Sequence, residues 1–292
     1  MKQELKDQDM PRDEEIKAQH HSSDEESKMD PEPIYDNPTH KGYGRLKNKV
    51  AIVTGGDSGI GRAISVAFAK EGADVVIVYY DSNADAEDTR KIIEDYGARC
   101  ILMNGDLGES DFSRKIIEKT MSDLHRIDII VNNAAEQHPK ESLEEITDEQ
   151  LERTFRTNIF SMFYLVREAL PHLKEGAAVI NTNSVTSYAG NPQLIDYSST
   201  KGAITSFTRS LALNLASRKI RVNQVAPGPI WTPLIPSTFS GDDVKNFGKN
   251  VPLDRPGQPV ELAEAYVFLA SDGSTYMTGQ TLHINGGEII NG

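Results

Sequence analysis

The sequence predicts an α/β fold in which seven parallel strands form one doubly wound sheet with helices on both faces. Short apolar runs alternate with longer segments of helical periodicity from residue 49 onward. A glycine-rich turn follows the first apolar run and opens the first helical segment. The chain has 292 residues, which suits one large α/β domain. We therefore expect a single folded domain at residues 49–292, preceded by an extension at residues 1–48.

The extension differs in composition from the rest of the chain. Residues 1–30 contain ten acidic and five basic residues and almost no large apolar side chains. We expect them to form a flexible, partly disordered acidic arm. Residues 31–48 contain three prolines and two tyrosines, and they either lie extended across the domain or a neighbouring subunit, or form a plain tether. Adjacent His20 and His21 in a polar arm offer no rigid site, so we expect no metal.

The folded domain begins after Lys49 with VAIVTGG, an apolar run typical of a parallel strand that is buried on both faces. The next segment, DSGIGRAISVAFAKEG, has helical periodicity and ends near Gly72. Between them, Gly55, Gly59 and Gly61 let the chain turn sharply and let backbone N–H groups approach a pyrophosphate. This turn stands at the first strand–helix junction, where a dinucleotide-binding fold requires it.

The remaining strands and helices follow in alternation. Strand-like runs are expected at residues 73–80, 98–107, 125–135, 177–183, 219–228 and 280–286. Helical patterns are expected at residues 147–173, 197–216 and 259–271. In an open sheet of this kind, the site lies at the carboxyl ends of the strands.

The stretch from Ser184 to Lys201 brings together a hydroxyl, a phenol and an ammonium group. Tyr197 and Lys201 are four residues apart, so in a helix they lie on one face. A free tyrosine has a pKa of about 10, and a fixed positive charge nearby lowers it toward the range useful for a base. Taken alone, such a pair is typical of a solvated helix face, and the other motifs of the chain decide between the two interpretations.

The sequence resembles the short-chain dehydrogenases/reductases, which are nicotinamide-dependent oxidoreductases built on a single doubly wound Rossmann domain. The resemblance covers about residues 46–287 and is closest to bacterial, stress-associated oxidoreductases with a long polar N-terminal extension. The motifs that carry it occur in the family's order: TGGDSGIG at 54–61, Asp106, NNAA at 132–135, Asn158, Ser184, Tyr197 with Lys201, and Pro227-Gly228. It implies a Rossmann catalytic domain at residues 49–292 and a homotetramer.

The resemblance also implies a catalytic set of four polar residues, Asn158, Ser184, Tyr197 and Lys201. Tyr197 is implied as the acid/base, and Lys201 as the group that lowers its pKa and binds the nicotinamide ribose. Ser184 is implied to steady the substrate oxygen, and Asn158 to hold a water that links Lys201 to solvent. For Asn158, a hydrogen-bonded residue at a helix kink remains the alternative.

The dinucleotide-binding residues implied by the resemblance lie in the glycine turn, after the second strand, beside the adenine and near the nicotinamide. They are Gly55, Asp57, Ser58, Gly59, Ile60, Gly61, Tyr80, Asp81, Asp106, Leu107, Asn133, Tyr197, Lys201, Pro227, Gly228, Ile230 and Thr232. A helix N-cap is an alternative or additional role for Asp106. Ala135 replaces the family's usual glycine and is expected to narrow the site, and His138 is either a substrate contact or an incidental loop residue.

Residues near the second strand bear on the choice between NAD and NADP. Many NAD-using relatives carry an acid at the end of this strand, where this chain has Tyr79, followed by Tyr80 and Asp81. NADP-using relatives often carry a basic residue here or in the glycine turn, where this chain has Asp57 and Ser58. A 2′-phosphate would lack a cation, so we expect NAD to be preferred over NADP.

Composition and charge narrow the partners and the location. The net charge of −13 disfavours nucleic acid and anionic membranes, since both bind positive surfaces. No apolar run approaches the ~20 residues of a membrane span, and the first residues lack a signal-peptide core, so we expect a cytoplasmic protein. The single cysteine, Cys100, cannot form an internal disulfide and is expected to be a small buried apolar residue.

Residues 231–259 are rich in proline and glycine, as expected of a lid over an active site. Large apolar side chains in this segment indicate a substrate pocket of low charge: Trp231, Leu234, Ile235, Phe239 and Phe247. A sugar dehydrogenase and a general aldehyde reductase both remain open, because the pocket rather than the catalytic set determines specificity. A catalytically silent dinucleotide-binding sensor or assembly protein, with the acidic arm as its interacting element, is a candidate of another class.

Overall fold

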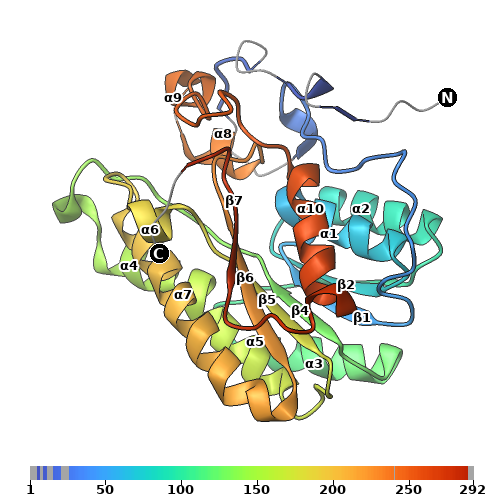
Figure 1. The fold of residues 1–292 in the computed structure, drawn as a ribbon. Helices are drawn as coiled ribbons and strands as arrows, with labels where there is room; N and C mark the ends of the chain where they lie inside the picture. The colour runs from blue at the N-terminus through green and yellow to red at the C-terminus, as the bar shows by residue number, and fades with distance from the viewer. Residues whose placement is uncertain (1–4, 7–8, 12–15, 21–25, 240, 289–292) are drawn as a thin grey trace.

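The computed structural model describes residues 5–6, 9–11, 16–20, 26–239 and 241–288. Its centre is one sheet of seven parallel strands in the order β3-β2-β1-β4-β5-β6-β7 (Figure 1). The strands are β1 (Val50–Thr54), β2 (Asp74–Tyr79), β3 (Cys100–Asn104), β4 (Ile129–Asn132), β5 (Ala178–Thr182), β6 (Arg221–Pro227) and β7 (Thr281–Ile284). The predicted α/β class and the doubly wound, seven-stranded parallel sheet are confirmed.

Helices cover both faces of the sheet (Figure 1). The α-helices are α1 (Gly59–Lys70), α2 (Asn83–Asp95), α3 (Ser110–Leu124), α4 (Asp148–Phe155), α5 (Ser161–Ala169), α6 (Thr186–Ala189), α7 (Ile195–Leu215), α8 (Leu234–Thr238), α9 (Gly241–Lys245) and α10 (Pro259–Ala270). Helices α1, α2 and α10 pack on one face, and α3, α5 and α7 pack on the other. None of the helices in the described ranges is both long and apolar enough to cross a membrane.

Strand β1 shows why the sheet is buried on both faces. All of its residues are buried, and alternate side chains enter opposite cores. Ala51 and Val53 contact the core under α1 and α10, whereas Val50 and Ile52 contact the core under α3 and α5. The strand order reverses beside β1, between its neighbours β2 and β4. A crevice at the carboxyl ends of these strands is the expected ligand site of such a sheet.

Residues 31–48 of the extension lie across their own domain. This agrees with the first of the two predicted alternatives and not with a plain tether. The backbone N–H of Ile34 donates to Gln258 Oε1 (2.9 Å), and the N–H of Val260 donates to the carbonyl of Ile34 (2.9 Å). Leu46 is fully buried, and the buried Glu71 carboxylate accepts hydrogen bonds from the backbone and guanidinium of Arg45. In Figure 1 the blue extension passes from the region of α8 and α9 to the side of α1.

The prediction of a flexible acidic arm falls in large part on residues that lie outside the described ones, His21 among them. The described residues of the arm include apolar side chains that are buried: Met10, Ile16 and Met29.

Three local predictions need correction. The segment 147–173 is not one regular helix, because a π-helical turn at Arg156–Phe160 separates α4 from α5. Cys100 is half-buried at the start of β3 rather than fully buried, and burial raises the pKa of its thiol to about 12. Glu109, and not Asp106, is the N-cap of α3; Asp106 Oδ1 instead accepts from the backbone N–H of Gly108 (2.7 Å).

Candidate active site

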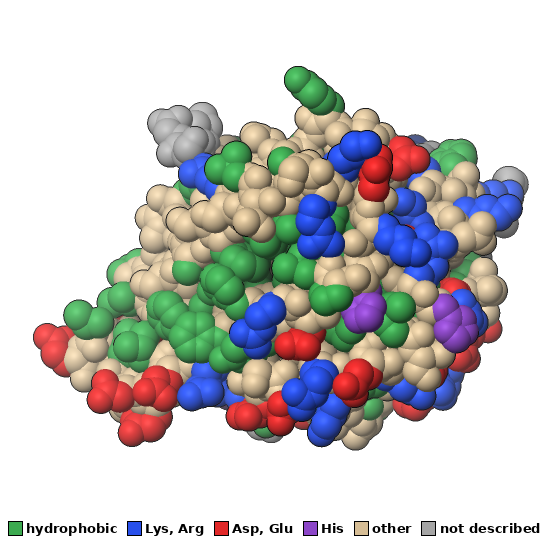
Figure 2. Space-filling view, turned by 90° about the horizontal axis from the view of Figure 1, so that it is seen from below, with side chains coloured by type: hydrophobic (Ala, Val, Ile, Leu, Met, Phe, Trp, Pro, Cys, Tyr) green, Lys and Arg blue, Asp and Glu red, His purple; other side chains and the backbone are tan. Residues whose placement is uncertain are grey.

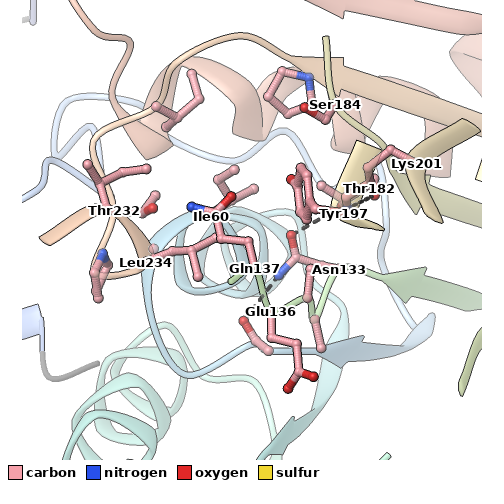
Figure 3. A pocket seen from close by; sticks show the side chains of 18 of the residues that line it. Ile60, Asn133, Glu136, Gln137, Thr182, Ser184, Tyr197, Lys201, Thr232 and Leu234 are labelled. Atoms are coloured by element: carbon pink, nitrogen blue, oxygen red, sulfur yellow. Dashed lines mark hydrogen bonds between the residues drawn. The ribbon is translucent and has the colours of Figure 1, made fainter. Parts of the chain in front are cut away.

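A cavity of about 540 Å³ opens at the carboxyl ends of the strands, where the strand order reverses. This volume lies in the range of small-molecule sites. The glycine turn after β1, the ends of β2 to β6, α7 and the segment that follows β6 all contribute to its lining. Figure 3 shows side chains from these elements pointing toward one another around the hollow.

Most of the site residues predicted from the sequence meet in this cavity. Those that line it are Gly55, Asp57, Ser58, Gly59, Ile60, Tyr80, Asp81, Asp106, Leu107, Asn133, Ser184, Tyr197, Lys201, Pro227, Gly228, Ile230 and Thr232. Gly61 and Asn158 are outside this lining and lie behind it.

The glycine turn is shaped by close backbone approaches. Gly55 and Gly59 adopt φ values of 61° and 51°, which L-residues with a side chain rarely adopt. A Cβ on Gly61 would lie 1.7 Å from the carbonyl oxygen of Gly55, so glycine there lets α1 meet β1. The Asn133 side chain donates to the carbonyls of Thr54 (3.1 Å) and Gly55 (3.3 Å), which fixes the start of the turn.

At the end of β2, acidic groups and one arginine border the cavity. Burial raises the pKa of the Asp57 carboxyl to about 7, and the nearby Asp85 acts in the same direction. The guanidinium of Arg153 lies 5.6 Å from the ring of Tyr80 and donates to Asp106 Oδ2 (2.5 Å) and Glu136 (3.1 Å). Arg153 was not predicted as a site residue, because nothing in the sequence of a charged helix shows which arginine turns inward.

Helix α7 buries the predicted acid/base pair. Tyr197 is 8% exposed and Lys201 is 1% exposed, so the solvated-face interpretation does not hold. Lys201 Nζ lies 5.2 Å from the centroid of the Tyr197 ring and donates to the carbonyl oxygen of Thr182 (3.0 Å). In Figure 3 the labelled side chains of Ser184, Tyr197 and Lys201 lie on one side of the cavity, beside Thr182.

Burial shifts the two pKa values of this pair in opposite directions. It raises the pKa of Tyr197 to about 12, against the lowering effect of a hydrogen bond with Ser184. It lowers the pKa of Lys201 to about 7. The sequence suggested that Lys201 would bring the tyrosine pKa down, but loss of hydration is the larger effect for both groups here. The phenol is therefore protonated at neutral pH.

Two predicted polar residues are held by hydrogen bonds around this pair. Ser184 Oγ accepts from the backbone N–H (3.2 Å) and the hydroxyl (3.1 Å) of Thr186. Asn158, in the π-helical turn, donates to the Glu136 carbonyl (2.9 Å) and to Thr200 Oγ1 (3.2 Å), and it accepts from the Glu136 N–H (2.9 Å). Protein groups thus use both donor positions of the Asn158 amide and one of the two acceptor positions of its oxygen, which agrees with the helix-kink alternative.

Several structural partners were missed in the sequence. Thr182 Oγ1 donates to Asn133 Oδ1 (3.1 Å) and lies 2.7 Å from the Tyr266 hydroxyl. Asp196, next to Tyr197, accepts from Gln150 (3.0 Å) and so ties α7 to α4. In the sequence, the only sign of these contacts is a polar residue in an apolar strand or at the start of a helix. Such a residue indicates that a hydrogen-bond partner is needed but does not identify the partner.

The segment after β6, predicted as a lid, borders one side of the cavity. Four of its predicted apolar residues line the cavity: Leu234, Ile235, Phe239 and Phe247. The prediction for Trp231 is wrong, because this side chain is fully buried and its Nε1 donates to the carbonyl of Pro31 (2.8 Å). Ala135 lines the cavity, as does Gln137, whereas His138 points to Glu136 (3.6 Å) and is not in the lining.

One group of possible metal ligands lies outside this cavity. His40, Glu71 and Glu264 place their ligand atoms within 4.8 Å of one another. The guanidinium of Arg45 donates to Glu71 (2.5 Å) and to Glu264 (2.9 Å), so a cation already neutralises both carboxylates. We assign no metal to this group.

The residues of the cavity fit a nicotinamide dinucleotide. The turn before α1 leaves room for backbone to approach a pyrophosphate, because Gly55 and Gly59 carry no side chain there. At the other end, a Cβ on Gly228 would lie 2.7 Å from the backbone of Asn285, so glycine brings the chain after β6 close to the sheet. The resemblance predicts Asp57 and Tyr80 at the ribose end and Ile230 at the nicotinamide end, and all three residues line the cavity.

Comparison with known proteins agrees with this geometry. A family model described as enoyl-(acyl carrier protein) reductase matches residues 55–288. General stress protein 39 of Bacillus subtilis is 58% identical over 91% of this chain and 93% of its own length. Glucose and ribitol dehydrogenase of Daucus carota is 50% identical over 90% of this chain and 93% of its own length.

Solved structures show the same fold. A short-chain dehydrogenase from Burkholderia cenocepacia in complex with NADP is 30% identical, with a TM-score of 0.78 over 83% of this chain and 98% of that one. The 3-ketoacyl-(acyl-carrier-protein) reductase of Brucella melitensis complexed with NADH is 33% identical, with a TM-score of 0.77 over the same shares. The chain therefore belongs to the short-chain dehydrogenases/reductases and is an NAD(P)-dependent oxidoreductase of that family, acting on CH–OH and C=O groups.

Proposed function

We propose that this enzyme reversibly reduces the carbonyl carbon of an aldehyde, ketone or sugar, with Tyr197 as the acid/base. The observation that carries the proposal is the buried cluster of Ser184, Tyr197 and Lys201 in the wall of a cavity that fits a dinucleotide. A phenol, a hydroxyl and an ammonium group at one place can move a proton to or from a reacting oxygen. A sensor without catalysis would not require this complete set.

When bound, the nicotinamide supplies or accepts the hydride. In reduction, Tyr197 donates its proton to the carbonyl oxygen, and in oxidation its phenolate removes the proton of the alcohol. Ser184 hydrogen-bonds the same oxygen, where negative charge develops. Lys201 binds the nicotinamide ribose and stabilises the phenolate, and Asn158 lies where it can order a water that returns the proton from solvent.

The cavity lining supports a small substrate with both polar and apolar groups. Gln137, Asn191 and Asn250 offer side-chain amides, whereas Phe239 and Phe247 offer aromatic surface. Amide groups pair with hydroxyls, so the lining accommodates a sugar or polyol as well as a simple aldehyde. The names of the two relatives, a glucose and ribitol dehydrogenase and a general stress protein, agree with a sugar substrate and a stress role for this chain.

We propose NAD as the preferred cofactor. The cavity lining near the end of β2 includes Asp57, Ser58, Tyr80 and Asp81. Arg153, the cation beside this group, is already paired with two carboxylates. A 2′-phosphate would thus meet acids and no free positive charge, whereas a ribose hydroxyl can donate to them. Solved relatives hold either NADP or NADH, so their titles do not decide the choice.

We also propose that the enzyme is a homotetramer. Figure 2 shows hydrophobic side chains gathered in a broad patch on one side of the face seen from below, with charged side chains around it. Large apolar residues are exposed on α4, the π-helical turn, α5 and α7: Leu151, Phe160, Phe163 and Leu213. Exposed apolar surface of this kind is typical of a subunit interface.

The first prediction concerns the acid/base. Tyr197→Phe removes the hydroxyl and little volume, so we expect turnover to fall by about 10³-fold or more while dinucleotide affinity stays within about twofold. The absorbance of the reduced nicotinamide at 340 nm measures turnover, and titration of Trp231 fluorescence measures binding. The control is Tyr276→Phe, at a fully exposed tyrosine, which should behave as the parent. Equal loss of binding and turnover would contradict the role of Tyr197.

A second prediction follows from the opposed pKa values. With the pKa of Tyr197 at about 12, alcohol oxidation should accelerate as pH rises toward the alkaline range, because it needs the phenolate. A bound nicotinamide ribose favours the charged form of Lys201, so Lys201→Met should move the rising limb to still higher pH and weaken dinucleotide binding. The pKa of Lys201 is about 7 instead of 10.5, so folding disfavours its charged form, and this cost is largest below pH 7 and disappears by about pH 10.5.

Lys201→Met should therefore not lower the melting temperature, which serves as the control for folding. An unchanged pH profile with normal dinucleotide affinity would show that Lys201 has no electrostatic role.

A third prediction concerns the cofactor. The ratio kcat/KM should be higher for NADH than for NADPH, and Tyr80→Arg should shift the ratio toward NADPH by about tenfold, because a guanidinium pairs with a 2′-phosphate. Steady-state kinetics with both cofactors measure the ratio, and Tyr276→Arg is the control for an added surface charge. A parent enzyme that prefers NADPH would overturn the proposal.

A fourth prediction concerns assembly. Phe163 is 51% exposed, and its ring centroid lies 4.4 Å from that of Phe207. Phe163→Glu should convert the tetramer to smaller species, because it places a charge in an apolar interface. Light scattering measures the mass, and Leu253→Glu, at another exposed apolar residue, should leave it unchanged. If the unmodified enzyme is a monomer in light scattering, the proposed homotetramer is wrong.

A further inference from the structure

The extension places a carboxylate against the glycine turn. Glu26 is 3% exposed, and its Oε2 accepts a hydrogen bond of 2.6 Å from the backbone N–H of Gly59, the first residue of α1. Its Oε1 lies 3.2 Å from Nη1 of Arg62, which is one turn further along the helix. One acid thus satisfies a free amide at the start of α1 and a buried guanidinium together.

Arg62 connects this acid to both sides of the ribose end of the cavity. Its Nε donates to the carbonyl oxygen of Asp57 (3.0 Å), within the glycine turn, and its Nη2 donates to Asp85 Oδ1 (3.2 Å), on α2. Asp85 Oδ2 accepts from the backbone N–H of Glu26 (3.1 Å) and from the hydroxyl of Ser82 (2.8 Å). The extension, the glycine turn and the loop after β2 are therefore held by one buried cluster.

This cluster lies behind the cavity wall. Asp57, Ser58 and Gly59 line the cavity, whereas Glu26 and Arg62 do not. The Glu26 carboxylate therefore contacts the turn from outside the cavity lining. In this position it can support the turn without taking the place of a ligand in the cavity.

We propose that Glu26 is a positioning residue for the dinucleotide, which holds the glycine turn and Arg62 in the geometry that the cofactor's pyrophosphate requires. The inference rests on the dinucleotide-binding function proposed above. It gives the extension a defined part in cofactor binding, although that segment lies far from the Rossmann motifs in the sequence.

Changing Glu26 to glutamine has two opposed effects. Loss of a negative charge near an anionic ligand favours binding, and Arg62 offsets that charge only in part because it also pairs with Asp85. Glu26 accepts from Gly59 with one carboxylate oxygen and from Arg62 with the other, whereas glutamine has an NH2 donor in place of one of these oxygens. One contact must break and the turn must move, and we expect this loss to outweigh the gain.

The extension also contacts the opposite wall, which gives the experiment a reporter. Ile16 and Met29 pack with Trp231 and Ile235, and Trp231 Nε1 donates to the Pro31 carbonyl. Trp231 is the only tryptophan of the sequence. Its emission maximum therefore reports whether the extension stays docked when Glu26 is changed.

The test compares full-length Glu26→Gln with Glu32→Gln, a change of an exposed acid in the same segment. For Glu26→Gln we expect the Kd and KM for NADH to rise about tenfold, kcat at saturating NADH to stay within about twofold, and the Trp231 emission to stay unchanged. Glu32→Gln should match the parent in all three measurements. Glu26→Asp, which keeps the charge but shortens the side chain by one methylene, should show the same rise in Kd and is the variant to use if Glu26→Gln does not fold.

Unchanged NADH affinity in these variants would overturn the proposal. Tighter binding would overturn it as well, because it would mean that the carboxylate competes with the cofactor. An equal rise in the Kd for NADH in Glu32→Gln would show that a general change of charge causes the effect, which would also overturn the proposal. A parent enzyme that binds neither NADH nor NADPH would contradict the proposed function instead, so the two failures are distinguishable.

Discussion

The burial of the Lys201 ammonium is the constraint on which the rest of the site depends. A charged group that is 1% exposed needs a defined partner, since burying it without one is costly. The carbonyl of Thr182, at the end of β5, provides that partner at 3.0 Å. Helix α7 must therefore lie close against the sheet, and Ala212 and Leu215 on its inner face pack into the core with β5 and β6. The position of Tyr197, on the same helix, follows from this packing.

Buried side-chain amides at the carboxyl ends of the strands also need defined hydrogen-bond partners. Asn132 on β4 donates to Asn181 on β5 (2.8 Å), and Asn181 donates to Thr208 on α7 (2.8 Å). Asn183 in turn donates to Gln224 on β6 (3.0 Å). Breaking one of these contacts would leave a further buried polar group unpaired in a low-dielectric interior, so the network holds neighbouring strands in register. The side chains that we propose as catalytic thus stand on rigid elements, and the pocket segment after β6 is free to vary with the substrate.

Much of this structure could be predicted from the sequence, for identifiable reasons. The parallel sheet follows from apolar runs of strand length, and the catalytic set follows from ordered motifs. The buried contacts of Glu26 could not be predicted, because an acid in a polar segment normally remains solvated. Its partners Gly59 and Arg62 lie 33 and 36 residues further along the chain, and only the folded structure brings them to it. The position of Arg153 in the cavity lining and the burial of Trp231 away from the cavity depend on tertiary contacts in the same way.

The opposed pKa shifts of Tyr197 and Lys201 indicate how ligand binding and chemistry are coupled. In the protein alone, the phenol is protonated and the ammonium is close to its titration point at neutral pH. A ligand whose hydroxyls accept hydrogen bonds from Lys201 favours the charged ammonium, and the charged ammonium favours the phenolate of Tyr197. Because such coupling is reciprocal, deprotonation of Tyr197 also strengthens the hold of Lys201 on the ligand. If Tyr197 is the acid/base, as we propose, the site acts as a base only when it is occupied, because burial keeps the phenol protonated in the protein alone.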